Sequence, residues 1–140
     1  MQIRIMVPSE LVRLRDLTAA IDAVLEANAV SREVRGDVQL IAEEIVANAI
    51  EYGGGGAETE IVVQIMALER QLAIEFRDCG RPFDPLAVEA PMLDAPLEER
   101  AIGGLGLHLV NELAESLSYT REEPYNVLRV TVRSDTQPVA

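Results

Sequence analysis

The sequence predicts an α+β fold, a two-layer sandwich in which one mixed, mostly antiparallel sheet carries helices on one face. Three observations predict it. Segments of alternating apolar residues come in neighbouring pairs, segments with helical spacing are few and long, and 49% of the 140 residues are hydrophobic. A sheet and a set of helices that each bury one apolar face pack together as two layers. The length fits a single domain over residues 1–140.

The first part of the chain predicts one strand and two helices. Apolar side chains occupy every second position over 2–7, which indicates a strand. Ser9 and Ser31 each precede a stretch of helical spacing, and serine oxygens accept hydrogen bonds from the N–H groups of a first helical turn. The two expected helices cover about residues 10–28 and 32–51. The glycines at 53–56 are expected to end the second one.

The middle of the chain predicts a hairpin and then a long loop. Residues 60–68 and 72–77 are rich in β-branched and apolar side chains, and the tripeptide 69–71 between them is the expected turn. Residues 80–104 contain four prolines and no sustained periodicity. Loops of this length inside a compact domain are usually functional or disordered. We therefore expect part of the function here.

The last part of the chain predicts a helix and a second hairpin. Helical spacing indicates a helix over about 105–115. Residues 117–122 and 127–133 alternate, and the tetrapeptide 123–126 is the expected turn between them. The predicted order is therefore strand, two helices, two strands, loop, helix and two strands.

Charge and composition exclude several classes of function. The net charge is −12, and all twelve basic residues are arginine. Nucleic acid and anionic lipid are recognised by clustered cations, so we expect binding to neither. A chain without lysine has no Walker-type phosphate loop and no amine for Schiff-base catalysis.

Single cysteine and histidine residues narrow the possibilities further. Cys79 excludes an internal disulfide framework, and we expect it to be a small buried thiol. His108 cannot form a zinc site alone, and we expect it at the edge of the core. No apolar run is long enough to span a membrane and no basic-then-apolar leader opens the chain, so we expect a cytoplasmic protein.

The stretch EEIVANAIEY ends the second helix and places a carboxylate and an amide one turn apart. On a helical wheel Asn48 lies about 40° from Glu44, and both lie at the rim of the apolar stripe, while Glu43 belongs to the solvated face. Oxygen ligands of this kind suit Mg²⁺, and a carboxylate can accept a proton from a hydroxyl. The simpler alternative is a surface carboxylate beside a satisfied amide.

Two further motifs have functional and structural interpretations. Asp78 stands at the end of a strand, where it can accept a hydrogen bond from an exocyclic amine such as that of adenine; Gly80 lets the chain turn. An Asp-x-Gly turn without function is the alternative. The glycines of GGLGLHLV, from Gly103 onward, lead into a helix whose N–H groups can bind phosphate, or they form a flexible hinge.

Together these motifs resemble a known superfamily over nearly the whole chain. They are similar to the N, G1 and G2 boxes of the Bergerat-fold (GHKL) ATPases, and the short length and Asp-x-Gly-x-x-Phe form resemble the branch of anti-sigma-factor serine/threonine kinases. The segments that carry the resemblance are Glu44-x-x-x-Asn48, Asp78-x-Gly80-x-x-Phe83 and Gly103-Gly104-Leu105-Gly106-Leu107.

The resemblance implies a role for each motif residue. Glu44 would be the general base, Asn48 the Mg²⁺ ligand and Asp78 the adenine-binding residue, with Gly80 shaping the adenine pocket. Residues 84–102 would be a lid. The remaining nucleotide contacts would come from Tyr52, Phe83, Arg100, which is the candidate for the γ-phosphate, and Gly103, Gly104, Leu105, Gly106 and Leu107.

The same resemblance implies cofactors and partners. The cofactors would be ATP and Mg²⁺, and the reaction would transfer the γ-phosphate to a serine of a STAS-type anti-anti-sigma protein. A sigma factor or another regulator would be a further partner, and dimerisation is expected from the resemblance alone. The alternative function is an ATP-dependent protein-binding regulator without phosphotransfer, because binding and catalysis use the same boxes.

Overall fold

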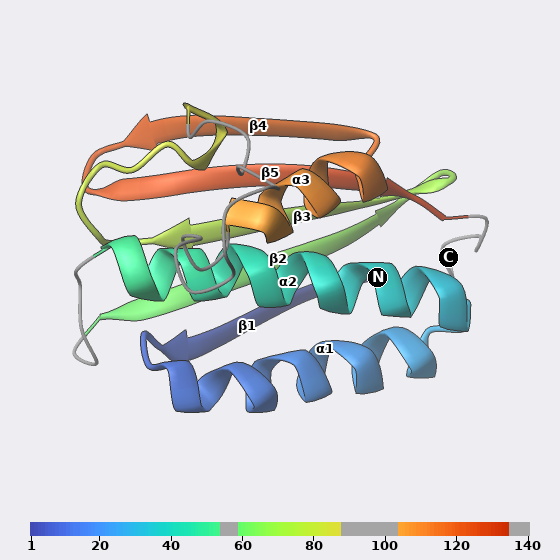
Figure 1. Ribbon diagram of the computed structural model, residues 1–140. Coiled ribbons are helices and arrows are strands. Elements are labelled where there is room, and N and C mark those ends of the chain that lie inside the picture. The colour runs from blue at the N-terminus through green and yellow to red at the C-terminus, as the bar shows by residue number, and fades with distance from the viewer. Residues whose placement is uncertain (54–58, 88–103, 135–140) are drawn as a thin grey trace.

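The computed structural model describes residues 1–53, 59–87 and 104–134. Three α-helices lie side by side on one face of a single five-stranded sheet (Figure 1). The elements in chain order are β1 (Gln2–Pro8), a 3-10 turn η1 (Leu11–Arg13), α1 (Leu14–Ala27), α2 (Arg32–Gly53), β2 (Glu60–Leu68), β3 (Gln71–Asp78), a 3-10 turn η2 (Pro85–Ala87), α3 (Gly104–Leu113), β4 (Ser116–Glu122) and β5 (Tyr125–Arg133). The predicted α+β sandwich and its order of elements are confirmed.

The sheet is antiparallel throughout, rather than mixed as predicted, and its strand order is β1-β2-β3-β5-β4. The hairpin of β4 and β5 is therefore attached to β3 through its second strand. This register places Asn126 on β5 opposite Asp78 on β3. Two residues 48 positions apart in the chain thus become neighbours, because strands that pair need not be consecutive.

An aliphatic core fills the space between the helices and the sheet. As the composition predicts, isoleucine, valine and leucine form most of it, with Phe76 as its buried aromatic residue. Along β3 the buried residues alternate with half-buried ones. The fully buried members from the helices are Leu17, Ile21, Leu25, Val38, Ile41, Ala42, Val46 and Val110.

The helix boundaries show which capping predictions were right. Ser31 caps α2, since its Oγ accepts a hydrogen bond of 3.3 Å from the backbone N–H of Val34. Ser9 does not cap α1, which begins later, after the turn η1. The Ser9 side chain is instead buried, and its backbone N–H donates to the carbonyl of Thr59 at 2.9 Å. Ser9 therefore joins β1 to the start of β2.

Both hairpin turns are shorter than the sequence predicted. Gln71 pairs with Leu68, so the first turn is Glu69 and Arg70, and Arg70 adopts a positive φ of 61°. Tyr125 pairs with Glu122, so the second turn is Glu123 and Pro124. Two residues of the predicted tetrapeptide turn, Tyr125 and Asn126, therefore belong to β5.

The ends of the other two predicted helices lie within two residues of their expected positions. The last helix ends at Leu113 rather than near residue 115. Helix α2 ends at Gly53, where the glycine run begins, and residues 54–56 lie outside the described part. None of the described helices is both long and apolar enough to cross a bilayer.

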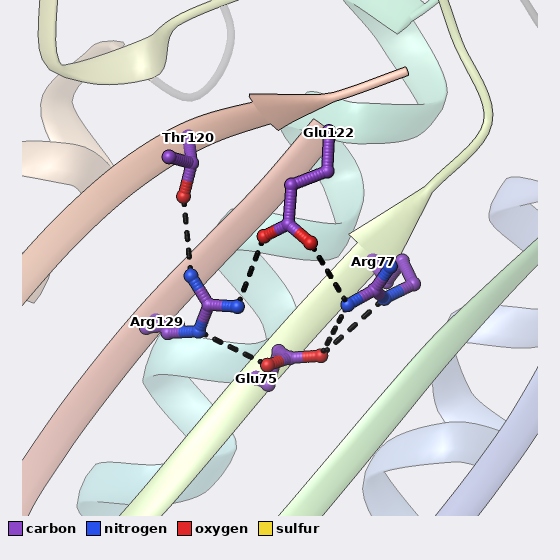
Figure 2. Close-up of polar contacts among 5 residues, drawn as sticks. All are labelled: Glu75, Arg77, Thr120, Glu122 and Arg129. Atoms are coloured by element: carbon purple, nitrogen blue, oxygen red, sulfur yellow. Dashed lines mark hydrogen bonds and ion pairs between the residues drawn. The ribbon is translucent and has the colours of Figure 1, made fainter. Parts of the chain in front are cut away.

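The face of the sheet away from the helices carries a ring of four charged side chains (Figure 2). Arg129 contacts Glu75 at 3.1 Å and Glu122 at 3.0 Å, and Arg77 contacts the same two carboxylates at 3.1 and 3.7 Å. Arg129 also donates to the hydroxyl of Thr120 at 3.1 Å. The ring joins β3, β4 and β5, so it holds the last hairpin against the strand that ends at Asp78.

Candidate active site

Helix α2 delivers Asn48 to a small cavity between the helix and the sheet. Asn48 is 4% exposed, and its Nδ2 has no hydrogen-bond partner among the described residues. The wheel prediction holds for its neighbours, since Glu44 is half-buried and Glu43 is exposed. A buried amide with an unused donor costs free energy. Such a group is typical of a binding site that is completed by a ligand.

Glu44 lies one turn before Asn48 on the same helix. Burial raises the pKa of its carboxyl above the ordinary value, and the adjacent charge of Glu43 raises it further. A higher pKa makes the carboxylate a better proton acceptor near neutral pH. Glu44 is not one of the residues that line the cavity.

Strand β3 ends at the second predicted site residue, Asp78. Its Oδ1 accepts a hydrogen bond of 3.1 Å from the backbone N–H of Gly80, which fixes the turn after the strand. Burial raises the pKa of Asp78; hydrogen bonds from Asn126 and Gly80 and the charge of Arg121 oppose this effect. Asp78 lines the same cavity as Asn48, so the structure brings these two predicted residues together.

Asn126 is a buried residue that sequence reasoning missed. Its Nδ2 donates to Asp78 Oδ1 at 3.1 Å and to the carbonyl of Arg81 at 2.8 Å. Its Oδ1 accepts the backbone N–H of Phe83 at 3.2 Å and the hydroxyl of Tyr119. The sequence analysis assigned Asn126 to the turn at 123–126 rather than to a strand. No local pattern shows which strand pairs with β3.

Further contacts fix the segment 79–83. Arg121 on β4 donates to the carbonyl of Gly80 at 2.9 Å. Arg81 donates to the carbonyl of Tyr52, in the last turn of α2, at 3.1 Å. The rings of Tyr52 and Phe83 stack with their centroids 5.2 Å apart. The end of α2 and the turn after β3 belong to separate sequence motifs. These contacts hold the two segments together.

The cavity has an apolar wall and a polar end. Its volume is about 30 Å³, which is room for about two water molecules. Ile45, Ala49 and Phe83 contribute apolar surface, while Asn48, Asp78 and Asn126 contribute polar groups. A few polar groups at fixed positions on an apolar wall are typical of ligand sites.

The glycine-rich motif lies at the start of α3, as predicted. The helix begins at Gly104, and it contacts α2. For Gly104, Leu105, Gly106 and Leu107 the structure describes the backbone only. Arg100, Gly103 and residues 88–102 of the expected lid lie outside the described residues.

Two expectations about single residues are wrong. Cys79 is exposed rather than buried, because it follows the last residue of β3 in the turn after the strand. His108 is exposed rather than at the core edge, and its Nε2 lies 3.3 Å from Glu112 Oε1 on the next turn of α3. Neither residue contributes to the cavity.

The donor set fits a hard divalent cation. Asn48 offers a buried amide and Glu44 a half-buried carboxylate one helical turn away, and Mg²⁺ prefers such oxygen ligands. The described residues contain no group of three or more histidine, cysteine, aspartate or glutamate side chains that could hold a metal. Mg²⁺ sites commonly use one or two protein ligands together with substrate phosphates.

A family model and a curated relative each match most of the chain. Residues 7–132 match the family model of the histidine kinase-like ATPase domain. The chain is 28% identical over 105 residues to the serine/threonine-protein kinase BtrW of Bordetella bronchiseptica. The matched region covers 74% of this chain and 74% of BtrW.

Solved structures show the same fold. The RsbU and RsbW domains of Rv1364c from Mycobacterium tuberculosis superpose with a TM-score of 0.68 at 13% identity, over 99% of this chain and 33% of that one. The catalytic domain of histidine kinase ThkA gives a TM-score of 0.54 at 14% identity, over 98% of this chain and 99% of that one. The resemblance to the Bergerat-fold ATPases is confirmed, and the chain belongs to the family of histidine kinase-like ATPase domains.

Proposed function

We propose that this protein binds ATP with Mg²⁺ and transfers the γ-phosphate to a serine of a STAS-type anti-anti-sigma partner. The observation that supports it best is that Asp78 and Asn48, the expected adenine and metal residues, line one cavity. The similarity to a serine/threonine-protein kinase supports the choice of protein phosphorylation. The STAS-type partner, with a sigma factor or another regulator beside it, comes from the sequence resemblance.

Each residue has a role in this proposal. Asp78 accepts a hydrogen bond from the exocyclic amine of adenine, and the stacked rings of Phe83 and Tyr52 border the base. Asn48 holds Mg²⁺ through its amide oxygen, and Glu44 takes the proton of the serine hydroxyl. Backbone N–H groups at the start of α3, from Gly104 to Leu107, receive the phosphates, and Gly103 remains a candidate for a further contact. Arg100 remains the candidate for the γ-phosphate.

Positioning and electrostatics supply most of the rate in phosphoryl transfer. Bound Mg²⁺ neutralises charge on the phosphate oxygens. The protein contributes the Glu44 carboxylate, whose pKa is raised, and the N-terminus of α3, where the helix dipole favours negative charge. A chain without lysine meets all these requirements.

One observation favours a second candidate, a nucleotide-dependent regulator that binds proteins without transferring phosphate. Glu44 is absent from the cavity lining that holds Asn48 and Asp78. A site of that kind binds ATP with full strength and leaves the γ-phosphate in place.

Calorimetric titration with ATP, with and without Mg²⁺, tests the proposal. We expect Mg²⁺-dependent binding by the wild type and loss of binding by Asp78→Asn. Asp16→Asn is the matched control, because Asp16 is an exposed carboxylate on α1. A well-folded wild type that binds neither ATP nor ADP contradicts the nucleotide site, whereas binding without transfer to a STAS-domain protein of the same genome favours the second candidate.

A further inference from the structure

Asn126 uses its whole hydrogen-bonding capacity inside the protein. An asparagine amide has two N–H donors and an oxygen with two lone pairs. The amide N–H groups donate to Asp78 and to the carbonyl of Arg81. The amide oxygen accepts hydrogen bonds from the N–H of Phe83 and the hydroxyl of Tyr119. The side chain is 5% exposed. Asn126 therefore acts on a ligand through the groups that it holds.

The orientation of this amide follows from two backbone groups. The carbonyl of Arg81 can only accept, so the atom 2.8 Å away must be the amide nitrogen. The N–H of Phe83 can only donate, so the atom 3.2 Å away must be the amide oxygen. Asn126 consequently presents a donor to Asp78, and an amide rotated by 180° would lose both backbone bonds.

The two carboxylate oxygens of Asp78 differ in their hydrogen bonding within the described part of the chain. Oδ1 receives hydrogen bonds from Asn126 Nδ2 and the Gly80 N–H, both at 3.1 Å. No described residue donates to Oδ2. An amide donor favours the ionised form of the carboxyl, which opposes the effect of burial. An ionised oxygen accepts hydrogen bonds and cannot donate one.

We propose that Asn126 is a positioning residue that sets the nucleobase preference of the site by holding Asp78 as a pure acceptor at the cavity. An acceptor at this place selects a base with an amino group at the 6-position and rejects one with a carbonyl there. Adenine has the amine and hypoxanthine has the carbonyl, so the site prefers ATP to ITP. This inference rests on the proposed nucleotide site.

Replacing the amide by a carboxyl reverses this chemistry. Asn126→Asp puts a second carboxyl beside Asp78, where the present contact is 3.1 Å. Two carboxylates this close cannot both ionise easily, so the pair retains a proton. A protonated pair can donate to a carbonyl, which brings the affinities for ATP and ITP closer together.

The test is the ratio of dissociation constants for ATP and ITP, measured by calorimetry with Mg²⁺. We expect a wild-type preference for ATP of at least about tenfold and a preference below about threefold in Asn126→Asp, because an unpaired buried acceptor is costly. Asn111→Asp makes the same change at an exposed position of α3 and is expected to keep the wild-type ratio. A general loss of structure lowers both affinities and leaves their ratio unchanged.

Further variants keep the inference falsifiable. If Asn126→Asp does not fold, Asn126→Ser decides, since the shorter side chain removes the amide donor and is expected to lower the preference. Tyr119→Phe is expected to keep the preference, because the two backbone groups still orient the amide. A preserved ratio in well-folded Asn126→Asp, or in well-folded Asn126→Ser where the first variant does not fold, overturns the inference alone, and so do equal wild-type affinities for ATP and ITP. A wild type that binds neither nucleotide overturns the proposed function as well.

Discussion

Asn126 donates a 3.1 Å hydrogen bond to Asp78 from the directly opposite position on the neighbouring strand. The pair lies at the end of β3, where the chain leaves the sheet toward Phe83. Because Asn126 also bonds the backbone at Arg81 and Phe83, one side chain fixes both the carboxylate and the turn that follows it. The position of Asp78 in the candidate site therefore depends on the hairpin of β4 and β5 as well as on the Asp-x-Gly motif.

Glu44→Gln separates binding from transfer. We expect the ATP dissociation constant to stay within about threefold, and the rate of phosphate transfer to fall by about 100-fold or more, because a glutamine cannot accept the serine proton. Transfer of labelled γ-phosphate to a STAS-domain protein measures the rate. Glu26→Gln, at an exposed position of α1, is the control and is expected to keep the wild-type rate. Unchanged transfer in Glu44→Gln would show that another group is the base.

Asp78→Asn is expected to leave the protein at least as stable as wild type at neutral pH, although it abolishes ATP binding. Burial raises the pKa of Asp78 above its ordinary 3.8, so the folded state holds this proton more tightly than the unfolded state. The wild type consequently loses stability as pH rises through the window above 3.8, and an uncharged amide avoids that loss. Urea unfolding at pH 3 and pH 7 tests this: the advantage of the variant should be present at pH 7 and smaller at pH 3. The opposite order would mean that the ionised form is net stabilised.

Asn48→Ala is expected to be no less stable than wild type without nucleotide. The buried Nδ2 has no partner in the described part of the chain, and such a group costs about 1–3 kcal/mol. The variant should also lack the rise in melting temperature that the proposed binding of ATP and Mg²⁺ predicts for the wild type. Thermal unfolding with and without ligand measures both effects, and Asn111→Ala on the exposed side of α3 is the control. A large destabilisation of the unliganded variant would show that Asn48 is a purely structural amide.

Ile41→Ala and Leu40→Ala compare neighbouring residues on α2. Ile41 is fully buried and Leu40 is 43% exposed. We expect Ile41→Ala to lower the free energy of unfolding by about 2–5 kcal/mol, because it leaves a cavity in the core. Leu40→Ala should change it by less than about 0.5 kcal/mol. Urea titration gives both values, and similar losses at the two positions would contradict the assignment of the buried face.

The ring of Glu75, Arg77, Glu122 and Arg129 should contribute modestly and in a salt-dependent manner (Figure 2). A double-mutant cycle of Arg129→Met and Glu122→Gln is expected to give a coupling free energy of about 0.2–1 kcal/mol at low salt and less at high salt. The more exposed pair of Arg13 and Asp16, at 3.4 Å, is the comparison and should show a smaller coupling. Equal couplings in the two pairs would mean that the ring adds nothing to an isolated surface contact.

The sequence by itself determined the local features of this protein. Periodicity identified the three helices and five strands, and the wheel placed Glu44 half-buried and Glu43 in solvent. The cap at Ser31 followed from its position before a helical pattern. These predictions succeed because burial on one face of an element leaves a pattern within a few residues of chain.

Only the tertiary structure decided how the elements meet. Nothing in the alternation of 127–133 indicates that this strand lies between β3 and β4. The prediction of a four-residue turn at 123–126 also placed Asn126 outside the sheet. Strand pairing is a choice among distant segments with similar apolar patterns, so its outcome depends on the packing of the whole core. The result is that Asn126 faces Asp78, and the candidate site acquires a residue that no local motif contains.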